Sequence, residues 1–399
     1  MLKQKMAAYD LPQRVTEMGI YPFFRTIESE QDTEVIISGK KVLMFGSNSY
    51  LGLTSHPKLK EASKAAIDKY GSGCAGSRFL NGTLDLHLEL EEKLAKFVGK
   101  EGTLVFSTGF QVNLGVLSSI PSRHDYIIID DLDHACIIDG ARLSFGKTLK
   151  YRHNDMASLE KILQKTEMDK VKIIAVDGVF SMEGDLAKLP EITALAKKYN
   201  ANVMVDDAHG LGVVGPLGRG TAAHFGVTDD VDLIMGTFSK SLASIGGFIA
   251  ADNDTINFLK HNARSLIFSA SIAPANAASV IAAIDLIYQE PERIDKLWSN
   301  TRHAMERLRA EGFDIGHTET PIIPIYIRDD FKTFKLTKLL LEDGIFVNPV
   351  VSPAVPSSSS LLRYSIMATH TIDQIDESID KITKISKELG ILEDAKVKA

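Results

Sequence analysis

The sequence predicts an α/β fold in which a mostly parallel sheet is flanked by helices and followed by a smaller α+β domain. Between Gly102 and Ala250, short apolar runs alternate with amphipathic stretches. Strands that are separated by helices need crossover connections, which make a sheet mostly parallel. After Ala273 the pattern changes to long helical stretches with few strands. Six strands are expected in the first region, at residues 103–106, 126–130, 171–176, 202–205, 233–235 and 247–250.

The flanking elements follow in order along the chain. Residues 1–60 predict a helix and a small hairpin around Gly39 and Lys40, and residues 61–273 form the expected large domain. Residues 274–399 predict the small domain. Its expected elements are helices at 276–289, 293–311, 331–342 and 372–389, strands at 322–327 and 361–366, and a proline-rich loop at 348–356.

Composition and charge narrow the classes of function. The 399 residues carry a formal net charge of −7, which argues against a nucleic-acid binder with a broadly basic surface but allows a local cationic groove. The two cysteines, Cys74 and Cys136, form no CxxC pair, so neither a disulfide framework nor a metal site is expected. The sequence shows no signal peptide and no apolar run that could span a bilayer. A cytoplasmic protein is expected, and peripheral contact with a membrane surface is left open.

An acid-rich strand end is the first candidate for chemistry. The apolar run 203–205 ends in Asp206 and Asp207, and His209 follows. In an open parallel sheet, ligands bind at the carboxyl ends of the strands. A carboxylate there suits a protonated ring nitrogen, and His209 can hydrogen-bond an oxygen of the same ring. Strand-end aspartates also bind metals, cap helices or orient histidines, so this motif alone leaves those roles open.

A lysine follows the next strand. The apolar run 233–235 leads through Thr237 and Ser239 to Lys240. In a partly desolvated site a lysine has a lowered pKa and acts as a nucleophile or a base, and the two hydroxyls can bind phosphate oxygens. A lone lysine is usually solvated, but the hydroxyl-rich strand end and the two glycines at 246–247 favour the functional interpretation.

Three further motifs are weaker. Gly109 and Phe110 open a helix after a strand, where the helix N-terminus favours phosphate, although Thr108 before them can be a simple cap. His134 follows a strand and can stack on a flat ring, or be a surface or capping residue. Arg363 lies inside an apolar strand, where it either pairs with a carboxylate substrate or forms an internal salt bridge.

The order of these motifs along the chain resembles that of the fold-type I pyridoxal 5'-phosphate (PLP) enzymes, and within them the α-oxoamine synthases. The resemblance runs from about Tyr21 to the final helix. It is carried by residues 45–53 (FGSNSYLGL), 177–185 (DGVFSMEGD) and 205–212 (VDDAHGLG). The resemblance implies PLP as the cofactor and a mostly parallel sheet of seven strands in the large domain.

Carried over to this sequence, the resemblance implies a role for each candidate. Lys240 forms the imine with PLP and then takes the substrate α-proton, while Asp206 pairs with the pyridine nitrogen and His209 with the phenolic oxygen. His134 stacks on the ring and helps to orient the substrate carboxylate. The other expected cofactor contacts are Gly109, Phe110, Thr237, Ser239 and, across the interface of a homodimer, Ser269 and Ser271. The expected contacts of the substrate carboxylate are Asn48, Ser77 and Arg363.

Within that family the chain is similar to the bacterial serine palmitoyltransferases. The similarity lies in residues 71–83 (GSGCAGSRFLNGT), 236–244 (GTFSKSLAS) and 348–356 (NPVVSPAVP). Ser239 stands where glycine acetyltransferases and aminooxononanoate synthases usually carry glycine. The similarity implies condensation of L-serine with a long-chain acyl-CoA (palmitoyl-CoA) to 3-oxosphinganine, CoA and CO2, the first step of sphingolipid synthesis. Glycine or alanine with a shorter thioester, an aminotransferase, and a non-catalytic paralogue are the alternatives.

Overall fold

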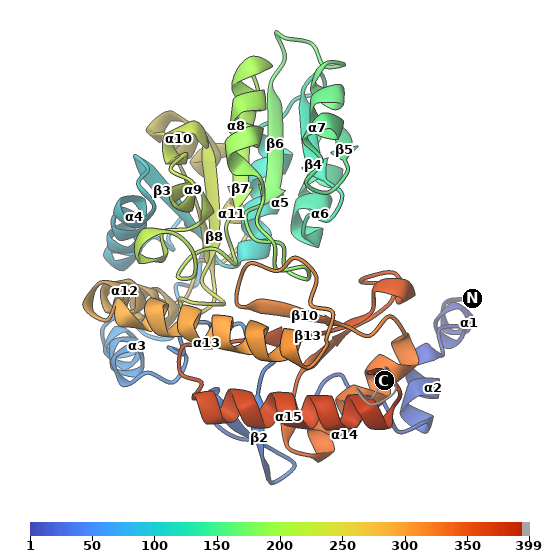
Figure 1. The fold of residues 1–399 in the computed structure, drawn as a ribbon. Helices are drawn as coiled ribbons and strands as arrows, with labels where there is room; N and C mark the ends of the chain where they lie inside the picture. Colours follow the sequence, from blue (N-terminus) through green and yellow to red (C-terminus); the bar gives the residue numbers. More distant parts are fainter. Residues whose placement is uncertain (393–399) are drawn as a thin grey trace. The chain divides into compact units, whose positions relative to one another are not determined.

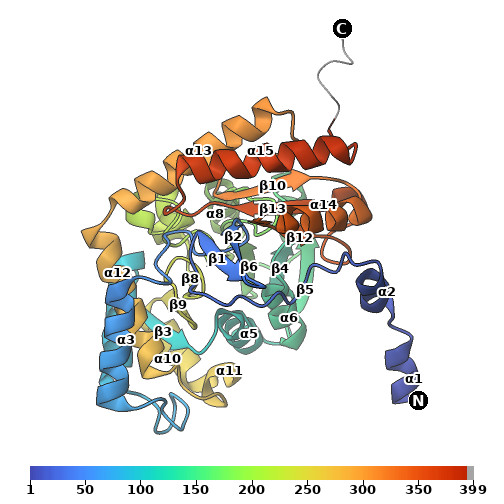
Figure 2. The same cartoon turned by 90° about the horizontal axis from the view of Figure 1, so that it is seen from below.

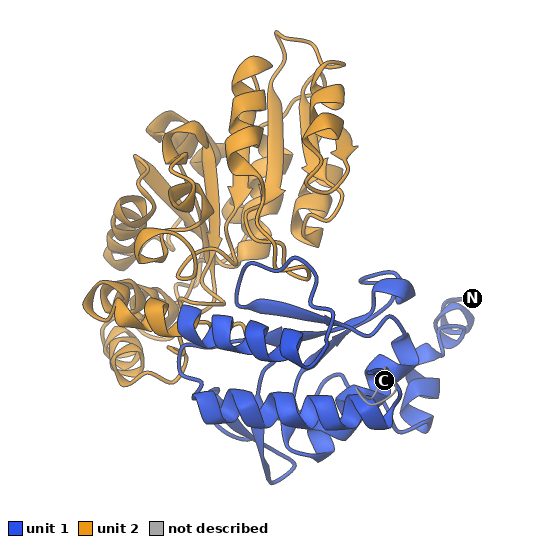
Figure 3. Ribbon diagram, in the orientation of Figure 1, with its two compact units in different colours: residues 1–47, 298–399 blue, residues 48–297 orange. Residues whose placement is uncertain are grey.

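The computed structural model describes residues 1–392, and Figures 1 and 2 show its ribbon from two directions. The chain forms two compact units, which Figure 3 colours separately. One unit consists of Met1–Ser47 and Trp298–Ala399, and the other of Asn48–Leu297. The observed division therefore differs from the predicted one, which is 1–60, 61–273 and 274–399.

Pairings between distant segments account for this difference. β2 (Lys40–Met44) pairs in parallel with β11 (Ile345–Phe346), so the N-terminal hairpin belongs with the C-terminal part of the chain. α12 (Pro274–Gln289) packs along α3 (Pro57–Tyr70), and both helices lie in the unit of residues 48–297. Local sequence patterns do not contain these contacts, because each depends on residues more than 200 positions apart.

A seven-stranded sheet forms the centre of the unit 48–297, as predicted. Its strand order is β3-β9-β8-β7-β6-β4-β5. The five strands from β4 to β8 run parallel, and β9 is antiparallel to both β8 and β3. The strands are β3 (Gly102–Phe106), β4 (Tyr126–Asp130), β5 (Lys147–Tyr151), β6 (Lys172–Asp177), β7 (Asn202–Asp206), β8 (Leu233–Thr237) and β9 (Gly247–Ala251).

One strand, β5, is absent from the sequence prediction. It lies at the edge of the sheet, where Lys147 pairs with Tyr126 of β4. Its residues are KTLKY, of which only Tyr151 is buried. Lysines on an edge strand discourage pairing with other chains, and they also remove the apolar run that identifies a buried strand. The inner strands β4 and β6 are buried at every position, as expected for a sheet covered on both faces.

Helices connect the strands and cover the sheet (Figure 1). Those of the unit 48–297, besides α3 and α12, are α4 (Asp85–Val98), α5 (Gly109–Ser119), α6 (Ala135–Leu143), α7 (Met156–Leu163), α8 (Leu189–Lys198), α9 (Thr221–His224), α10 (Asn253–Asn262) and α11 (Arg264–Ile267). α5 and α6 approach closely, since a Cβ added at Gly140 would lie 2.7 Å from the carbonyl oxygen of Asn113. This close approach brings Asn113 of α5 near Cys136 of α6. Among the described residues, none of the helices is long and apolar enough to cross a membrane.

The described part of the other unit contains two small sheets and several helices. β1 (Glu34–Ile37) and β2 form the predicted hairpin, and β10 (Ile322–Tyr326) pairs with β13 (Leu361–Ser365). Its helices are α1 (Leu2–Ala7), α2 (Leu11–Glu17), α14 (Asp330–Glu342) and α15 (Ile372–Glu388), and α13 (Glu292–Ala310) spans the division between the units.

The predicted proline-rich loop at 348–356 is only partly a loop. Its first three residues form β12 (Asn348–Val350), which pairs antiparallel with β13. β12 lies at the edge of its sheet, where Pro349 is tolerated although it has no N–H to donate. The prolines in this segment favoured the prediction of a loop, so the short edge strand β12 was not predicted.

Candidate active site

A cavity of about 380 Å³ lies in the unit 48–297, at the carboxyl ends of β7 and β8. This is the edge of a parallel sheet at which ligands bind. Most of the predicted site residues meet there. The cavity is lined by Gly109, Phe110, His134, Asp206, His209, Thr237, Ser239 and Lys240, together with residues that the sequence did not single out, including Asp177, Val179, Met235 and Ile245.

Asp206 is the last residue of β7 and is buried. Its Oδ2 accepts a hydrogen bond of 2.6 Å from Nδ2 of Asn113, and its Oδ1 accepts one of 3.0 Å from the backbone N–H of Ala208. The thiol of Cys136 lies 3.8 Å from Oδ2. A carboxylate held in this way by neutral donors at a cavity wall is suited to a cationic partner, such as a protonated ring nitrogen.

His134 is the N-cap of α6, so its backbone position is fixed by the start of that helix. Its Nδ1 accepts from the N–H of Cys136 at 3.2 Å and lies 2.8 Å from the Cys136 Sγ. Burial lowers the pKa of His134, and the charge of Lys240 lowers it further against the opposing effect of Asp206. A neutral imidazole on the cavity wall can stack on a flat ring.

Asn113 and Cys136 are site residues that sequence analysis missed. Both are buried, and their side chains contact each other with 2.9 Å between Nδ2 and Sγ. Burial and the neighbouring Asp206 raise the pKa of the Cys136 thiol, so it stays protonated. The only sequence signal for Cys136 is its place two residues after His134, and Asn113 lies one helical turn after Gly109.

Lys240 follows β8 and is half-buried. Thr237, at the end of β8, lies 3.0 Å from Ser239 between hydroxyl oxygens and donates to the Gly246 carbonyl at 3.1 Å. A Cβ added at Gly109 would lie only 2.7 Å from the Thr237 Oγ1, so this glycine lets the start of α5 approach the strand end. Hydroxyls beside the N-terminus of an α-helix provide the donors that a phosphate needs.

His209 and Asn48 are connected through a tyrosine that the sequence analysis left unassigned. The hydroxyl of the buried Tyr50 lies 2.7 Å from Nδ1 of His209 and donates to Oδ1 of Asn48 at 3.4 Å. Tyr50 stands inside the motif at 45–53, but only the tertiary structure shows that it contacts His209. The predicted substrate residue Asn48 and the predicted cofactor residue His209 thus share one hydrogen-bonded chain.

Three predicted serines lie outside the set of residues that line the cavity. The Ser77 hydroxyl is buried and makes no hydrogen bond with the described residues. Ser269 accepts from Nε2 of Gln111 at 3.0 Å, and the Ser271 hydroxyl donates to the carbonyl of Gly76 at 3.2 Å. Their predicted roles toward the substrate and toward a partner subunit stay predictions.

Arg363 belongs to the other compact unit, where it is buried in the middle of β13. Its Nη1 donates to the Ser365 hydroxyl at 2.9 Å. The predicted contact between Arg363 and a substrate carboxylate stays a prediction.

Comparisons with known proteins show the family of this chain. The family model described as "Aminotransferase class I and II" matches residues 40–382. A serine palmitoyltransferase of Bacteroides ovatus is 60% identical over 98% of this chain and 100% of its own length. The chain belongs to the α-oxoamine synthase family of fold-type I PLP enzymes.

Other members of the α-oxoamine synthase family are also similar. An 8-amino-7-oxononanoate synthase of Treponema denticola is 43% identical, over 95% of this chain and 96% of that protein. A solved serine palmitoyltransferase variant from S. paucimobilis, with a bound PLP–myriocin aldimine, has a TM-score of 0.95 at 34% identity and covers 98% of this chain and 100% of that chain. The fold is therefore that of a fold-type I PLP transferase.

The residues of the cavity fit PLP by their chemistry. An amine, a buried carboxylate, a neutral imidazole and a hydroxyl-lined helix start are all present. Two neutral donors, the Asn113 amide and the Ala208 N–H, fix the orientation of the buried Asp206 carboxylate at the cavity wall. A ligand with a protonated ring nitrogen and a phosphate would pair its nitrogen with Asp206 and its phosphate with the hydroxyls at the start of α5.

Proposed function

We propose that this enzyme uses PLP to condense L-serine with a long-chain acyl-CoA, releasing CO2 and CoA and forming 3-oxosphinganine. The observation that carries the proposal is the meeting of Lys240 and Asp206 in one cavity, in a chain that is 60% identical to a serine palmitoyltransferase. Palmitoyl-CoA is the expected acyl donor, and the reaction would begin sphingolipid synthesis.

The cavity residues divide the binding of PLP among them. When bound, PLP supplies an aldehyde that condenses with amines and a conjugated ring that accepts the electron pair left at the substrate α-carbon. The Lys240 amine would hold the aldehyde carbon, and Asp206 would favour the protonated pyridine nitrogen. His209, held by Tyr50, would bind the phenolic oxygen. Thr237, Ser239, Gly109 and Phe110 would bind or adjoin the phosphate.

The same residues would control the proton at the serine α-carbon. Lys240, displaced by the amine of serine, would act as the general base that removes this proton and later returns one. His134 would cover the ring and, with Asn48, Ser77 and Arg363, orient the serine carboxylate. Orientation decides which bond at the α-carbon breaks and keeps deprotonation in step with the arrival of the thioester.

The assembly and the cellular location follow from the same proposal. A homodimer would let Ser269 and Ser271 reach the phosphate site of the partner subunit. We place the enzyme in the cytoplasm, where both substrates are available, and peripheral contact with a membrane would suit its acyl-chain substrate. Sedimentation of the purified protein tests the homodimer, and flotation with lipid vesicles tests the membrane contact.

A matrix of amino acids against acyl-CoA thioesters, with released CoA as the signal, tests the substrates. We expect L-serine with a long-chain acyl-CoA to give the highest kcat/KM. Faster CoA release from glycine with acetyl-CoA, or from alanine with a pimeloyl thioester, would assign the chain to another reaction of the same family. Keto-acid formation from serine without any thioester would indicate an aminotransferase instead.

A further inference from the structure

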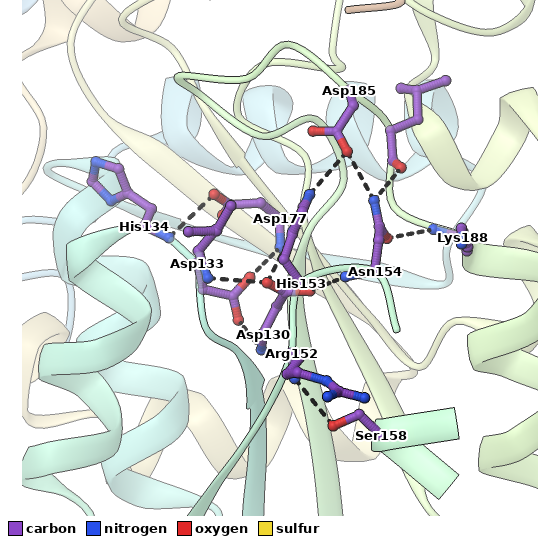
Figure 4. Close-up of polar contacts among 12 residues, drawn as sticks. Asp130, Asp133, His134, Arg152, His153, Asn154, Ser158, Asp177, Asp185 and Lys188 are labelled. Carbon is purple, nitrogen blue, oxygen red and sulfur yellow. Dashed lines mark hydrogen bonds and ion pairs between the residues drawn. The ribbon is translucent and has the colours of Figure 1, made fainter. Parts of the chain in front are cut away.

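A group of five buried or half-buried residues lies beside His134, at or after the carboxyl ends of β4, β5 and β6 (Figure 4). We call it the acid network, and it consists of Asp130, Asp133, His153, Asp177 and Asp185. The proposed reaction uses none of them. Four carboxyl groups and one imidazole in a largely buried space demand an explanation, because buried charges are unfavourable unless they are paired and hydrogen-bonded.

The first half of the acid network holds the backbone of His134. The backbone N–H of His134 donates to Oδ2 of Asp177 at 3.1 Å. Asp133 then joins two strand ends, because its Oδ1 accepts from the N–H of Asp177 at 2.9 Å and its Oδ2 accepts from the N–H of Asp130 at 2.8 Å. The segment that carries the His134 ring into the cavity is thereby tied to both β4 and β6.

The second half contains the only imidazole of the acid network. His153 lies between two carboxylates, with 3.0 Å from its Nδ1 to Oδ1 of Asp130 and 2.9 Å from its Nε2 to Oδ2 of Asp185. The Asp130 side chain is fully buried, whereas that of His153 is 24% exposed. The ring of His153 packs edge-on against Phe180, with 4.4 Å between centroids. This imidazole therefore closes the acid network toward solvent.

The charges are consistent with this arrangement. Burial, together with the neighbouring carboxylates, raises the pKa of Asp133 and that of Asp177 well above the ordinary value, which favours their neutral forms. Burial alone would lower the pKa of His153, but its hydrogen bonds to Asp130 and Asp185 outweigh this and raise the pKa to about 10. His153 thus brings a positive charge into hydrogen-bonding contact with the fully buried side chain of Asp130.

We infer that His153 is a positioning residue that sets the place of the His134 ring through Asp130, Asp133 and Asp177. Loss of the imidazole leaves the buried Asp130 with only the backbone N–H groups of Leu132 and Asn154 as donors and without a cationic partner. The segment between Asp130 and His134 is then expected to shift toward solvent. The inference rests on the proposed function, because it takes the His134 ring as the group that stacks on PLP.

A double-mutant cycle tests whether His153 acts through His134. His153→Phe removes both N–H groups and keeps a flat ring against Phe180, and His124→Phe makes the same change at an exposed histidine as the matched control. We expect His153→Phe to weaken the affinity of the apoenzyme for PLP about tenfold in the wild-type background, and less than twofold when His134→Ala is already present. Equal losses in both backgrounds would overturn the inference, as would no loss in either.

Two further measurements separate positioning from folding. Asparagine at position 153 can still donate to Asp130 from its amide but brings no positive charge, so His153→Asn is expected to recover only part of the PLP affinity and of the visible circular dichroism of the bound cofactor. If His153→Phe fails to fold, this variant carries the same cycle, with affinity at least threefold below wild type expected only when His134 is intact.

The apoenzyme provides a readout that does not need PLP. In protein labelled with 15N-histidine, His153→Phe should shift the ring resonances of His134, while His124→Phe should leave them in place. An unmoved His134 resonance would contradict the inference. Failure of the wild-type chain to bind PLP would instead contradict the proposed function and would leave this NMR test decisive for the positioning role.

Discussion

The carboxyl ends of β7 and β8 and those of β4 and β6 lie along the same edge of one sheet, yet they use their acidic residues differently. At the first pair, Asp206 and Lys240 line a cavity of about 380 Å³. At the second pair, Asp130 and Asp133 are buried, and His153 lies over them as a counter-ion. The first pair of strand ends opens onto the cavity, whereas at the second pair only Asp177 reaches it, and Asp130 and Asp133 are enclosed by the protein.

The difference shows how a parallel sheet can manage several carboxyl groups at one edge. At the ends of β4 and β6 the protein itself reduces the negative charge of its aspartates. Burial raises the pKa values of Asp133 and Asp177, and His153 pairs with Asp130. Asp206 at the end of β7 is instead held by Asn113 and a backbone N–H, which are neutral donors. Asp206 also lines the cavity, where a cationic ligand can reach it.

The largest expected effect is at the ends of β7 and β8. Lys240→Ala removes the amine that is proposed both to hold PLP and to move the α-proton, so turnover should fall below detection and the visible absorbance of the purified protein should disappear. Absorbance spectra and CoA release from serine with palmitoyl-CoA measure both. Retention of colour and activity in this variant would show that Lys240 is not the reactive lysine.

Asp206→Asn should reduce turnover by about 10²- to 10⁴-fold, because an amide cannot stabilise a protonated pyridine nitrogen as a carboxylate does. The isosteric side chain should still allow some PLP to bind. Loss of deuterium from α-deuterated serine, followed by NMR in the presence of a thioether analogue of the acyl-CoA, reports on the proton step directly. Rapid exchange in the variant would move the acid role to another residue.

Asp177→Asn makes the same change at the end of β6 and should lower turnover only about threefold. The pKa of Asp177 is raised, so its carboxyl is largely neutral, and asparagine keeps an oxygen that accepts from the His134 N–H. Asp177→Ala removes that acceptor and should destabilise the fold by about 1–3 kcal/mol. Steady-state kinetics measures the turnover of Asp177→Asn, and urea unfolding measures the stability of Asp177→Ala. An equal loss of turnover in Asp177→Asn and Asp206→Asn would contradict the distinction between the two pairs of strand ends.

The last comparison concerns the pH dependence of stability, where no change in turnover is involved. The pKa of His153 is raised to about 10 from 6.5, so the folded state holds this proton more tightly than the unfolded state does. The resulting stabilisation is complete below pH 6.5 and is lost as the pH rises toward 10, with a slope of at most about 1.4 kcal/mol per pH unit. The difference in unfolding free energy between wild type and His153→Phe should shrink over this window, and a constant difference would count against a charged His153.

Sequence patterns predicted that Asp206 and Lys240 each follow a strand, because each comes after a short apolar run typical of a buried strand, and the structure places both at one cavity. The sequence patterns missed elements and contacts that depend on tertiary structure. β5 has no apolar run, and β12 is concealed by its proline. No local pattern shows that Asn113 of α5 contacts Asp206 of β7, or that β2 pairs with β11.

Trapping the cofactor on the protein tests the central proposal most directly. Borohydride reduction makes the bond between PLP and a lysine permanent, and peptide mapping by mass spectrometry locates the pyridoxyl group. We predict that this group lies on Lys240 in the resting enzyme, and that incubation with L-serine before reduction protects Lys240 from it. A pyridoxyl group on a different lysine, or none on any lysine, would contradict the proposal.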